Sequence, residues 1–189
     1  MINKQDFKKI RENLARYDNK REELIKKARD VLKLSKQVIY SIHRKDMKEA
    51  AKLVSGVKKA KNELDKIASC DNKLFYEGSY SQAMQEYVEA LTYYGFIKNK
   101  KIPNWGSLKV SEEDYLKGIC DLTGELSRKA VMIAHKDAKQ VEKIKDLVEE
   151  IFGEFLKFNL RNSELRKKAD SIKWNLKKLE EVVYDIKRK

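Results

Sequence analysis

Residues 22–44 read EELIKKARDVLKLSKQVIYSIHR, and the pattern of this stretch decides the fold class. Its small and apolar residues recur at helical spacing, as they do on a helix with one buried face. They are Leu24, Ala28, Val31, Ser35, Val38, Ile39 and Ile42. Because neither Gly nor Pro occurs from about residue 4 to residue 45, nothing interrupts the helix that contains them. The sequence predicts one long helix over about residues 4–45, with any kink near Asp18 and Asn19.

The rest of the chain is also poor in helix breakers, with seven Gly and one Pro among 189 residues. No stretch alternates with the period of a strand. Apolar residues at helical spacing predict further helices over about residues 46–69, 80–98, 112–136, 138–159 and 163–187. The segment KNKKIPNWGSLKVS, residues 98–111, is expected to be the one long loop, with Ser111 as the N-cap of the next helix. The predicted fold class is all-α: one domain over residues 1–189, an antiparallel helical bundle of about six to seven helices.

The composition is that of a globular protein, with 41% hydrophobic and 39% charged residues. No apolar run approaches the roughly 18 to 20 residues that cross a bilayer, and the start MINKQDFKKI lacks the apolar core of a signal peptide. A cytoplasmic location and no membrane partner are therefore expected. Cys70 and Cys120 show no metal-ligand spacing, so both are expected to be buried, reduced thiols.

The charge is strongly positive, since 43 Lys and Arg against 30 Asp and Glu leave a formal net charge of +13. Five cations of the first helix fall within an arc of about 80° opposite its apolar face. These residues, the basic stripe, are Lys26, Arg29, Lys33, Lys36 and Arg44. Such a stripe suits the phosphates of a nucleic acid, which it would bind with little sequence preference. A basic face that is merely solvated is the alternative, and the sequence leaves both open. His43, which has no Ser or Cys partner at a suggestive spacing, is expected to be structural or to contact phosphate.

Two pairs of carboxylates lie on different predicted helices, each opposite the apolar stripe of its own helix. Glu86 and Glu89 are about 60° apart in projection, and Asp121 and Glu125 about 40° apart. One such pair is usually a solvated face, but two facing pairs offer the oxygen ligands that Mg²⁺ or Mn²⁺ prefers. A metal held there would activate water for attack on a phosphodiester. Gly118 and Gly124 lie inside the second of these helices at a cost in helix stability, and close approach of a neighbouring backbone is one expected reason.

The segments GSYSQAMQEYVEAL, residues 78–91, and DYLKGICDLTGELSRKAV, residues 114–131, resemble the signature segments of the translin superfamily, and more specifically of its TRAX branch. LSKQVIYSIHR and WGSLKV are similar to further parts of that family. The resemblance implies a translin-like helical fold, a hollow octameric barrel and a metal-dependent endoribonuclease. It implies catalytic, metal-holding roles for Glu86, Glu89 and Asp121, with Glu125 as the fourth candidate, and an RNA-binding role for Lys36.

The chain departs from eukaryotic TRAX in lacking its long acidic and polar insertion and its C-terminal tail. It resembles the compact archaeal versions, which implies a homo-octamer. The leading hypothesis is a Mg²⁺- or Mn²⁺-dependent endoribonuclease for single-stranded RNA, with duplexes expected to be poor substrates because a rigid duplex does not readily enter a closed cavity. A non-catalytic binder of single-stranded RNA or DNA is the alternative, and a helical scaffold whose basic face only keeps it soluble is a third.

Overall fold

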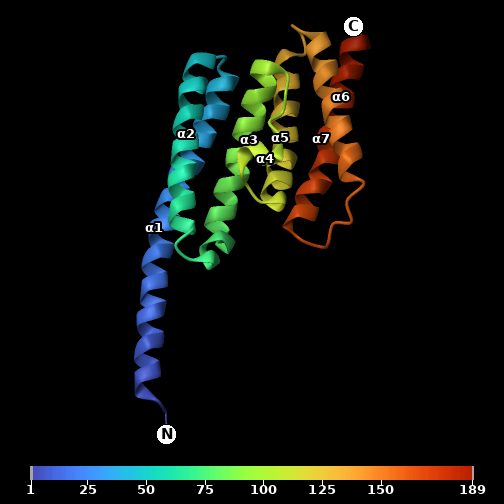
Figure 1. The fold of residues 1–189 in the computed structure, drawn as a ribbon. Helices are drawn as coiled ribbons and strands as arrows, with labels where there is room; N and C mark the ends of the chain where they lie inside the picture. The colour runs from blue at the N-terminus through green and yellow to red at the C-terminus, as the bar shows by residue number, and fades with distance from the viewer. Residues whose placement is uncertain (1, 189) are drawn as a thin grey trace.

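The computed structural model describes residues 2–188, and among these every regular element is a helix. Figure 1 shows the seven α-helices of the bundle, and a short 3₁₀ helix, η1, follows the second of them. Their bounds are α1 Lys4–His43, α2 Met47–Ala68, η1 Asn72–Tyr76, α3 Gly78–Asn99, α4 Trp105–Leu108, α5 Glu112–Ile133, α6 Ala138–Phe155 and α7 Glu164–Arg188. The predicted all-α fold class is therefore confirmed.

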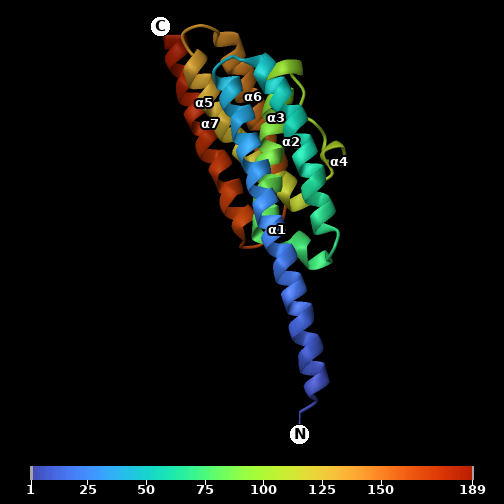
Figure 2. The same cartoon turned by 90° about the vertical axis from the view of Figure 1, so that its left-hand side faces the viewer.

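The long helices lie side by side as three pairs: α1 with α2, α3 with α5, and α6 with α7 (Figures 1 and 2). The middle pair joins the outer two, because α3 packs against α1 while α5 packs against both α6 and α7. The N-terminal half of α1 projects beyond the rest of the bundle in both views. The C-terminal half of α1 therefore lies against α3, and α7 lies against α5, so the central pair is flanked by helices from both ends of the chain.

The predicted helix bounds agree with the structure to within a few residues, and α1 continues through Asp18 and Asn19. Ser111 is the predicted N-cap of α5, since its hydroxyl accepts a hydrogen bond from the backbone N–H of Asp114 at 3.1 Å. The expected loop 98–111 differs from the structure, because it contains the one-turn helix α4. The Asn104 side chain caps that turn by accepting from the Ser107 N–H at 2.9 Å. So short a helix has no apolar period by which sequence could reveal it.

Gly118 marks a close approach between α5 and α3. A Cβ at this position would lie 2.6 Å from the Cβ of Val88 and 2.8 Å from the carbonyl oxygen of Gln85. Only glycine therefore allows the two helices to pack at this distance, which confirms the expected reason for Gly118. The same expectation is wrong for Gly124, where a Cβ would meet only the Asn175 side chain, at 3.8 Å.

The expectation of two buried, reduced thiols is right for Cys120 and wrong for Cys70. Cys120 is buried but Cys70 is exposed, because Cys70 lies in the turn between α2 and η1, and neither forms a disulfide. None of the helices in residues 2–188 is both long enough and apolar enough to cross a membrane.

Candidate functional site

The four predicted carboxylates lie on the central helix pair. Glu86 and Glu89 are on α3 and Asp121 and Glu125 are on α5, so the Gly118 contact holds the two pairs close to each other. All four side chains are half-buried rather than fully exposed. We refer to them together as the acid cluster. A surface hollow of about 440 Å³ opens beside it, lined by Lys36, Ile39, Tyr40, His43, Glu86, Glu89, Glu125 and Arg128.

Glu89 is the member of the acid cluster that has neither an ion pair nor a side-chain hydrogen bond within residues 2–188. Its pKa is raised to about 8, chiefly by burial and then by the negative charges of Asp121, Glu86 and Glu125. Burial also raises the pKa of Glu86, although the charge of Lys36 opposes the rise. Since the other three carboxylates all act on Glu89, the two pairs form one electrostatic unit.

The other three acids each have a basic partner side chain from elsewhere in the fold. The Lys36 ammonium on α1 lies 3.6 Å from a carboxylate oxygen of Glu86. His43 Nε2, also on α1, contacts the Glu125 carboxylate. On the other flank, Lys168 of α7 donates to Asp121. The flanking helices thus supply two lysines and a histidine to a central pair that carries the carboxylates.

His43 and Lys168 are the functional-site candidates that the sequence did not assign to the acid cluster. His43 is buried and its ring lies 5.4 Å from that of Tyr93, which supports the expected structural role, but its contact with Glu125 was not predicted. Lys168 and Asp121 are 47 residues apart. No local spacing relates two residues so distant, so only the packing of α7 on α5 reveals this pair.

The donor set of the acid cluster fits a hard divalent cation, because carboxylate oxygens are the ligands that Mg²⁺ and Mn²⁺ prefer and Glu89 has no other partner. In the described part of the chain, however, no three acidic, His or Cys side chains stand close enough together to hold a metal ion as they are placed. Three of the four acids point to Lys36, His43 and Lys168 instead. Those side chains would therefore have to turn from these partners toward a shared ion.

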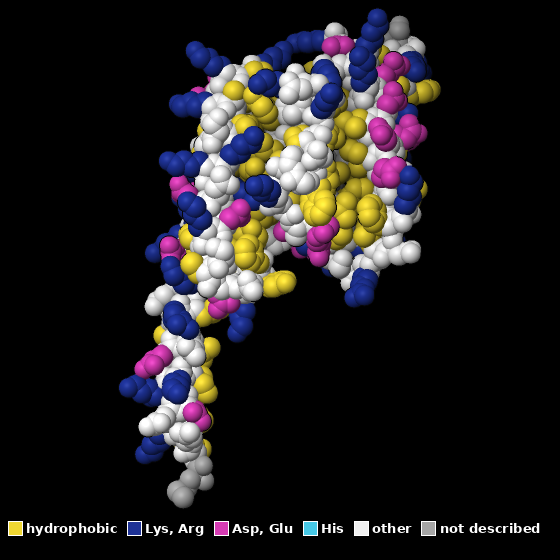
Figure 3. Space-filling view, in the orientation of Figure 1, with side chains coloured by type: hydrophobic (Ala, Val, Ile, Leu, Met, Phe, Trp, Pro, Cys, Tyr) yellow, Lys and Arg dark blue, Asp and Glu magenta, His cyan; other side chains and the backbone are white. Residues whose placement is uncertain are grey.

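The basic stripe lies exposed on α1, as the sequence predicts. Lys26, Arg29 and Lys33 have no ion pair within residues 2–188, and the Arg44 guanidinium lies 5.7 Å from the centre of the Tyr40 ring. Figure 3 shows Lys and Arg side chains along the whole α1 and α2 edge of the molecule. Of the five, the structure brings Lys36 into direct contact with the acid cluster. The stripe thus runs along α1 toward the carboxylates.

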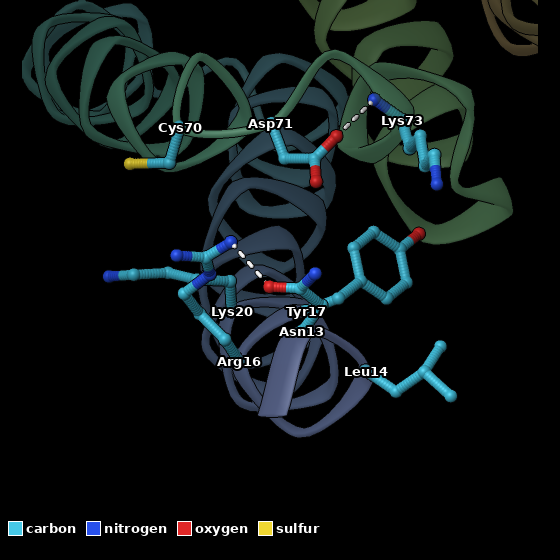
Figure 4. Close-up of a pocket in the computed structure, with 8 residues that line it drawn as sticks. All are labelled: Asn13, Leu14, Arg16, Tyr17, Lys20, Cys70, Asp71 and Lys73. Carbon is cyan, nitrogen blue, oxygen red and sulfur yellow. Dashed lines mark hydrogen bonds between the residues drawn. The ribbon is translucent and has the colours of Figure 1, made fainter. Parts of the chain in front are cut away.

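A second hollow, of about 730 Å³, lies where the projecting part of α1 meets the turn after α2 (Figure 4). It is lined by Asn13, Leu14, Arg16, Tyr17, Lys20, Cys70, Asp71 and Lys73. Its one carboxylate, Asp71, accepts a hydrogen bond from the backbone N–H of Lys73 at 3.0 Å. None of the predicted site residues lines it, and it holds no group of acids comparable to the acid cluster.

Comparison with known proteins identifies the family of the chain. The model of the Translin family matches residues 19–188. Translin-associated protein X of Rattus norvegicus is 25% identical over 224 residues, covering 96% of this chain and 77% of that protein. A crystal structure of apo-NeC3PO is 29% identical with a TM-score of 0.87, covering 98% of both chains.

A crystal structure of AfC3PO is 25% identical with a TM-score of 0.85, covering 96% of this chain and 97% of that chain. AfC3PO has also been solved in a complex with duplex RNA, and in that state it has the same fold. With the family model spanning almost the whole chain and the fold shared at full length, the chain belongs to the translin family and is similar within it to translin-associated protein X.

Proposed function

We propose that this protein is a Mg²⁺- or Mn²⁺-dependent endoribonuclease that cleaves single-stranded RNA inside a homo-octameric barrel. The observation that carries the proposal is the acid cluster: two carboxylate pairs on helices held together at Gly118, with Glu89 half-buried among the other three acids. A protein that only binds a polyanion gains nothing from acids at its binding surface, because they repel phosphate. Their presence beside the basic stripe therefore favours catalysis.

RNA as the partner is supported by the family and by the charge. The related AfC3PO forms a complex with duplex RNA, and this chain carries a net charge of +13 with the basic stripe exposed on α1. Lysines and arginines on one face bind the phosphate backbone without reading bases. Because AfC3PO binds a duplex, binding and cleavage have to be measured separately for single-stranded and duplex RNA.

The contacts within the site suggest a separate role for each residue. Glu86, Glu89, Asp121 and Glu125 would hold the metal, which when bound supplies an activated water and stabilises the leaving oxygen. Lys36 belongs to the basic stripe and also pairs with Glu86, so an RNA strand that follows the stripe is led to the acid cluster. His43 orients the Glu125 carboxylate through Nε2, and the buried ring of Tyr93 packs beside the imidazole and fixes its position.

The direct test is cleavage of a labelled single-stranded oligoribonucleotide by the whole protein, with Mn²⁺ or with EDTA. Glu89→Gln keeps the size of the side chain but removes a charged ligand, and should lower the rate at least roughly 100-fold. Glu180→Gln, at an exposed position of α7, is the matched control and should cleave normally. Cleavage that persists in EDTA, or that is equally fast in Glu89→Gln, contradicts the proposal.

A non-catalytic binder of single-stranded RNA or DNA is the second candidate function. It is favoured by one observation, the pairing of three of the acids with Lys36, His43 and Lys168, which is also how structural ion pairs would be arranged. Tight, salt-sensitive binding of an oligonucleotide without metal-dependent products would support this candidate over the nuclease.

A further inference from the structure

Lys168 reaches the acid cluster from α7, a helix that carries none of the predicted site residues. Its ammonium nitrogen lies 2.5 Å from Oδ2 of Asp121. The lysine side chain is 26% exposed and the aspartate side chain 31%, so this pair is largely shielded from water. A shielded ion pair is screened less by salt than a surface pair and interacts more strongly.

The charge of Lys168 acts on more than Asp121. Burial raises the pKa of both Glu86 and Glu89, and the positive charge of Lys168 opposes the rise at each of them. A single ammonium therefore offsets part of the repulsion among carboxylates that come from two different helices.

The other cations near the acid cluster are less suited to this role. Lys36 and Arg128 are 66% and 62% exposed, so water and salt weaken their interactions with Glu86 and Glu125. His43 is buried but carries a charge only when it is protonated. Among these groups, Lys168 is the shielded residue with a permanent charge.

The packing of α7 on α5 does not depend on the Lys168 contact alone. On one side of it in the sequence, Glu164 of α7 accepts a hydrogen bond from Lys117 of α5 at 3.2 Å. On the other side, Asn175 donates to the hydroxyl of Thr123 at 2.9 Å. These two contacts tie α7 to α5 independently of Lys168, so loss of the ammonium should leave the helix packing intact.

An ammonium and a divalent cation compete for the same carboxylate, because two positive charges a few ångströms apart repel each other strongly. We propose that Lys168 is the built-in counter-cation of the acid cluster: it holds the carboxylates together in the absence of metal and gives up Asp121 when a divalent ion binds. Lys168 thereby sets the concentration of divalent ion at which the site fills. This inference rests on the metal site of the proposed function, and it makes Lys168 a positioning residue.

The experiment compares Lys168→Met, which removes the charge, with Lys168→Arg, which keeps it. Lys167→Met is the matched control, because Lys167 is the neighbouring residue of α7, is exposed and has no ion pair within residues 2–188. The melting temperature is measured in EDTA and during a Mn²⁺ titration, and the Kd for Mn²⁺ is measured by calorimetry. Neither measurement needs RNA or activity.

Lys168→Met is expected to melt at a lower temperature than Lys167→Met in EDTA, because the carboxylates lose their counter-charge. It should bind Mn²⁺ at least roughly threefold more tightly than the unsubstituted protein, since the competing charge is gone, and should show a larger Mn²⁺-induced rise in melting temperature. Lys168→Arg should resemble the unsubstituted protein in EDTA. If Lys168→Met does not fold, the double variant Asp121→Asn with Lys168→Met, which removes both charges, should regain stability.

Weaker Mn²⁺ binding by Lys168→Met would overturn the inference, because it would mean that Lys168 only orients Asp121 as a ligand. Equal behaviour of Lys168→Met and Lys167→Met in both measurements would overturn it as well. In either case Mn²⁺ would still stabilise the unsubstituted protein, so the proposed nuclease would stand. Absence of any Mn²⁺ effect in the unsubstituted protein would instead count against the metal-dependent function itself.

Discussion

At the scale of single residues, Glu89 is a carboxylate whose surroundings disfavour its ionised form and thereby lower the stability of the fold. It is half-buried, lies near three other acids and has no cationic partner in the described chain. Native carboxylates more often gain a partner that lowers their pKa. Functional groups are commonly held in such unfavourable surroundings, and the acid cluster follows that pattern.

The raised pKa of Glu89 predicts a pH dependence of stability in the absence of metal. The group binds its proton more tightly in the folded state, with a pKa of about 8, than at its ordinary value of 4.5. The folded protein therefore holds more protons between these values, and the free energy of unfolding falls as the pH rises through this window. At a pH below 4.5 Glu89 does not lower the free energy of unfolding, whereas at a pH above about 8 it lowers this free energy by the full amount.

Glu89→Gln should accordingly be more stable than the unsubstituted protein in EDTA at pH 8.5, by on the order of 2 kcal/mol, with the difference vanishing near pH 4. Urea unfolding of both proteins across this pH range measures it, with Glu180→Gln as the control at an exposed site. A constant difference at all pH values would contradict the assignment of the effect to Glu89.

The four candidate acids could be singled out from sequence, but their partners could not. Helical projection places each acid pair opposite an apolar stripe, and in the structure all four acids are half-buried on the neighbouring helices α3 and α5. The projection says nothing about which other helix approaches, so the pairing of Asp121 with Lys168 and of Glu125 with His43 had no sequence signal. The metal-holding role of the four acids stays a prediction.

At the scale of helices, the contact between α3 and α5 decides whether the two acid pairs meet. Periodicity predicted both helices to within about two or three residues at each end, whereas α4 and η1 are too short to show a period. The sequence offered one hint of the contact itself, a glycine inside a helix. Of the two glycines inside α5, Gly118 marks a close approach and Gly124 does not, which only the packing distinguishes.

Gly118→Ala should destabilise the protein by about 1–3 kcal/mol, because its Cβ would overlap Val88 and the backbone oxygen of Gln85 and push α3 away from α5. Gly124→Ala is the matched control in the same helix. It has room for a methyl group and should be neutral or stabilising by up to about 1 kcal/mol, owing to the better helix propensity of alanine. Equal effects of the two substitutions on thermal unfolding would rule out the close contact.

The basic stripe of α1 makes a separate prediction about salt. Lys33→Ala removes one exposed cation from the stripe, and should reduce the slope of log affinity against log salt concentration by about 0.7 for single-stranded RNA. Fluorescence anisotropy in EDTA measures binding without cleavage. Lys177→Ala on α7, also exposed and without an ion pair in residues 2–188, should leave the slope unchanged. If both variants change it equally, the stripe is only part of a general positive field.

At the scale of the whole molecule, the projecting half of α1 leaves apolar side chains in water. Phe7, Ile10 and Leu14 are 54%, 52% and 59% exposed and share one face of the helix (Figure 3 shows hydrophobic side chains along one edge of this segment). In the proposed homo-octamer, such a face is expected to be covered by another copy of the chain.

Light scattering on the 22.2 kDa chain tests the assembly directly. We expect the mass of eight chains for the unsubstituted protein and a smaller mass for Leu14→Glu, which places a charge on the exposed apolar face. Lys9→Glu, on the opposite side of the same helix, should keep the larger mass. A monomeric unsubstituted protein at micromolar concentration would contradict the proposed barrel.

The unbroken helix α1 connects two distant regions of the molecule. A helix of 40 residues is about 60 Å long, and this one carries exposed apolar residues at its start and both Lys36 and His43 near its end. No loop or hinge separates the two regions. In the proposed octamer, a neighbouring subunit that covers the exposed start of α1 would bind the same continuous helix that carries Lys36 and His43, the residues in contact with Glu86 and Glu125.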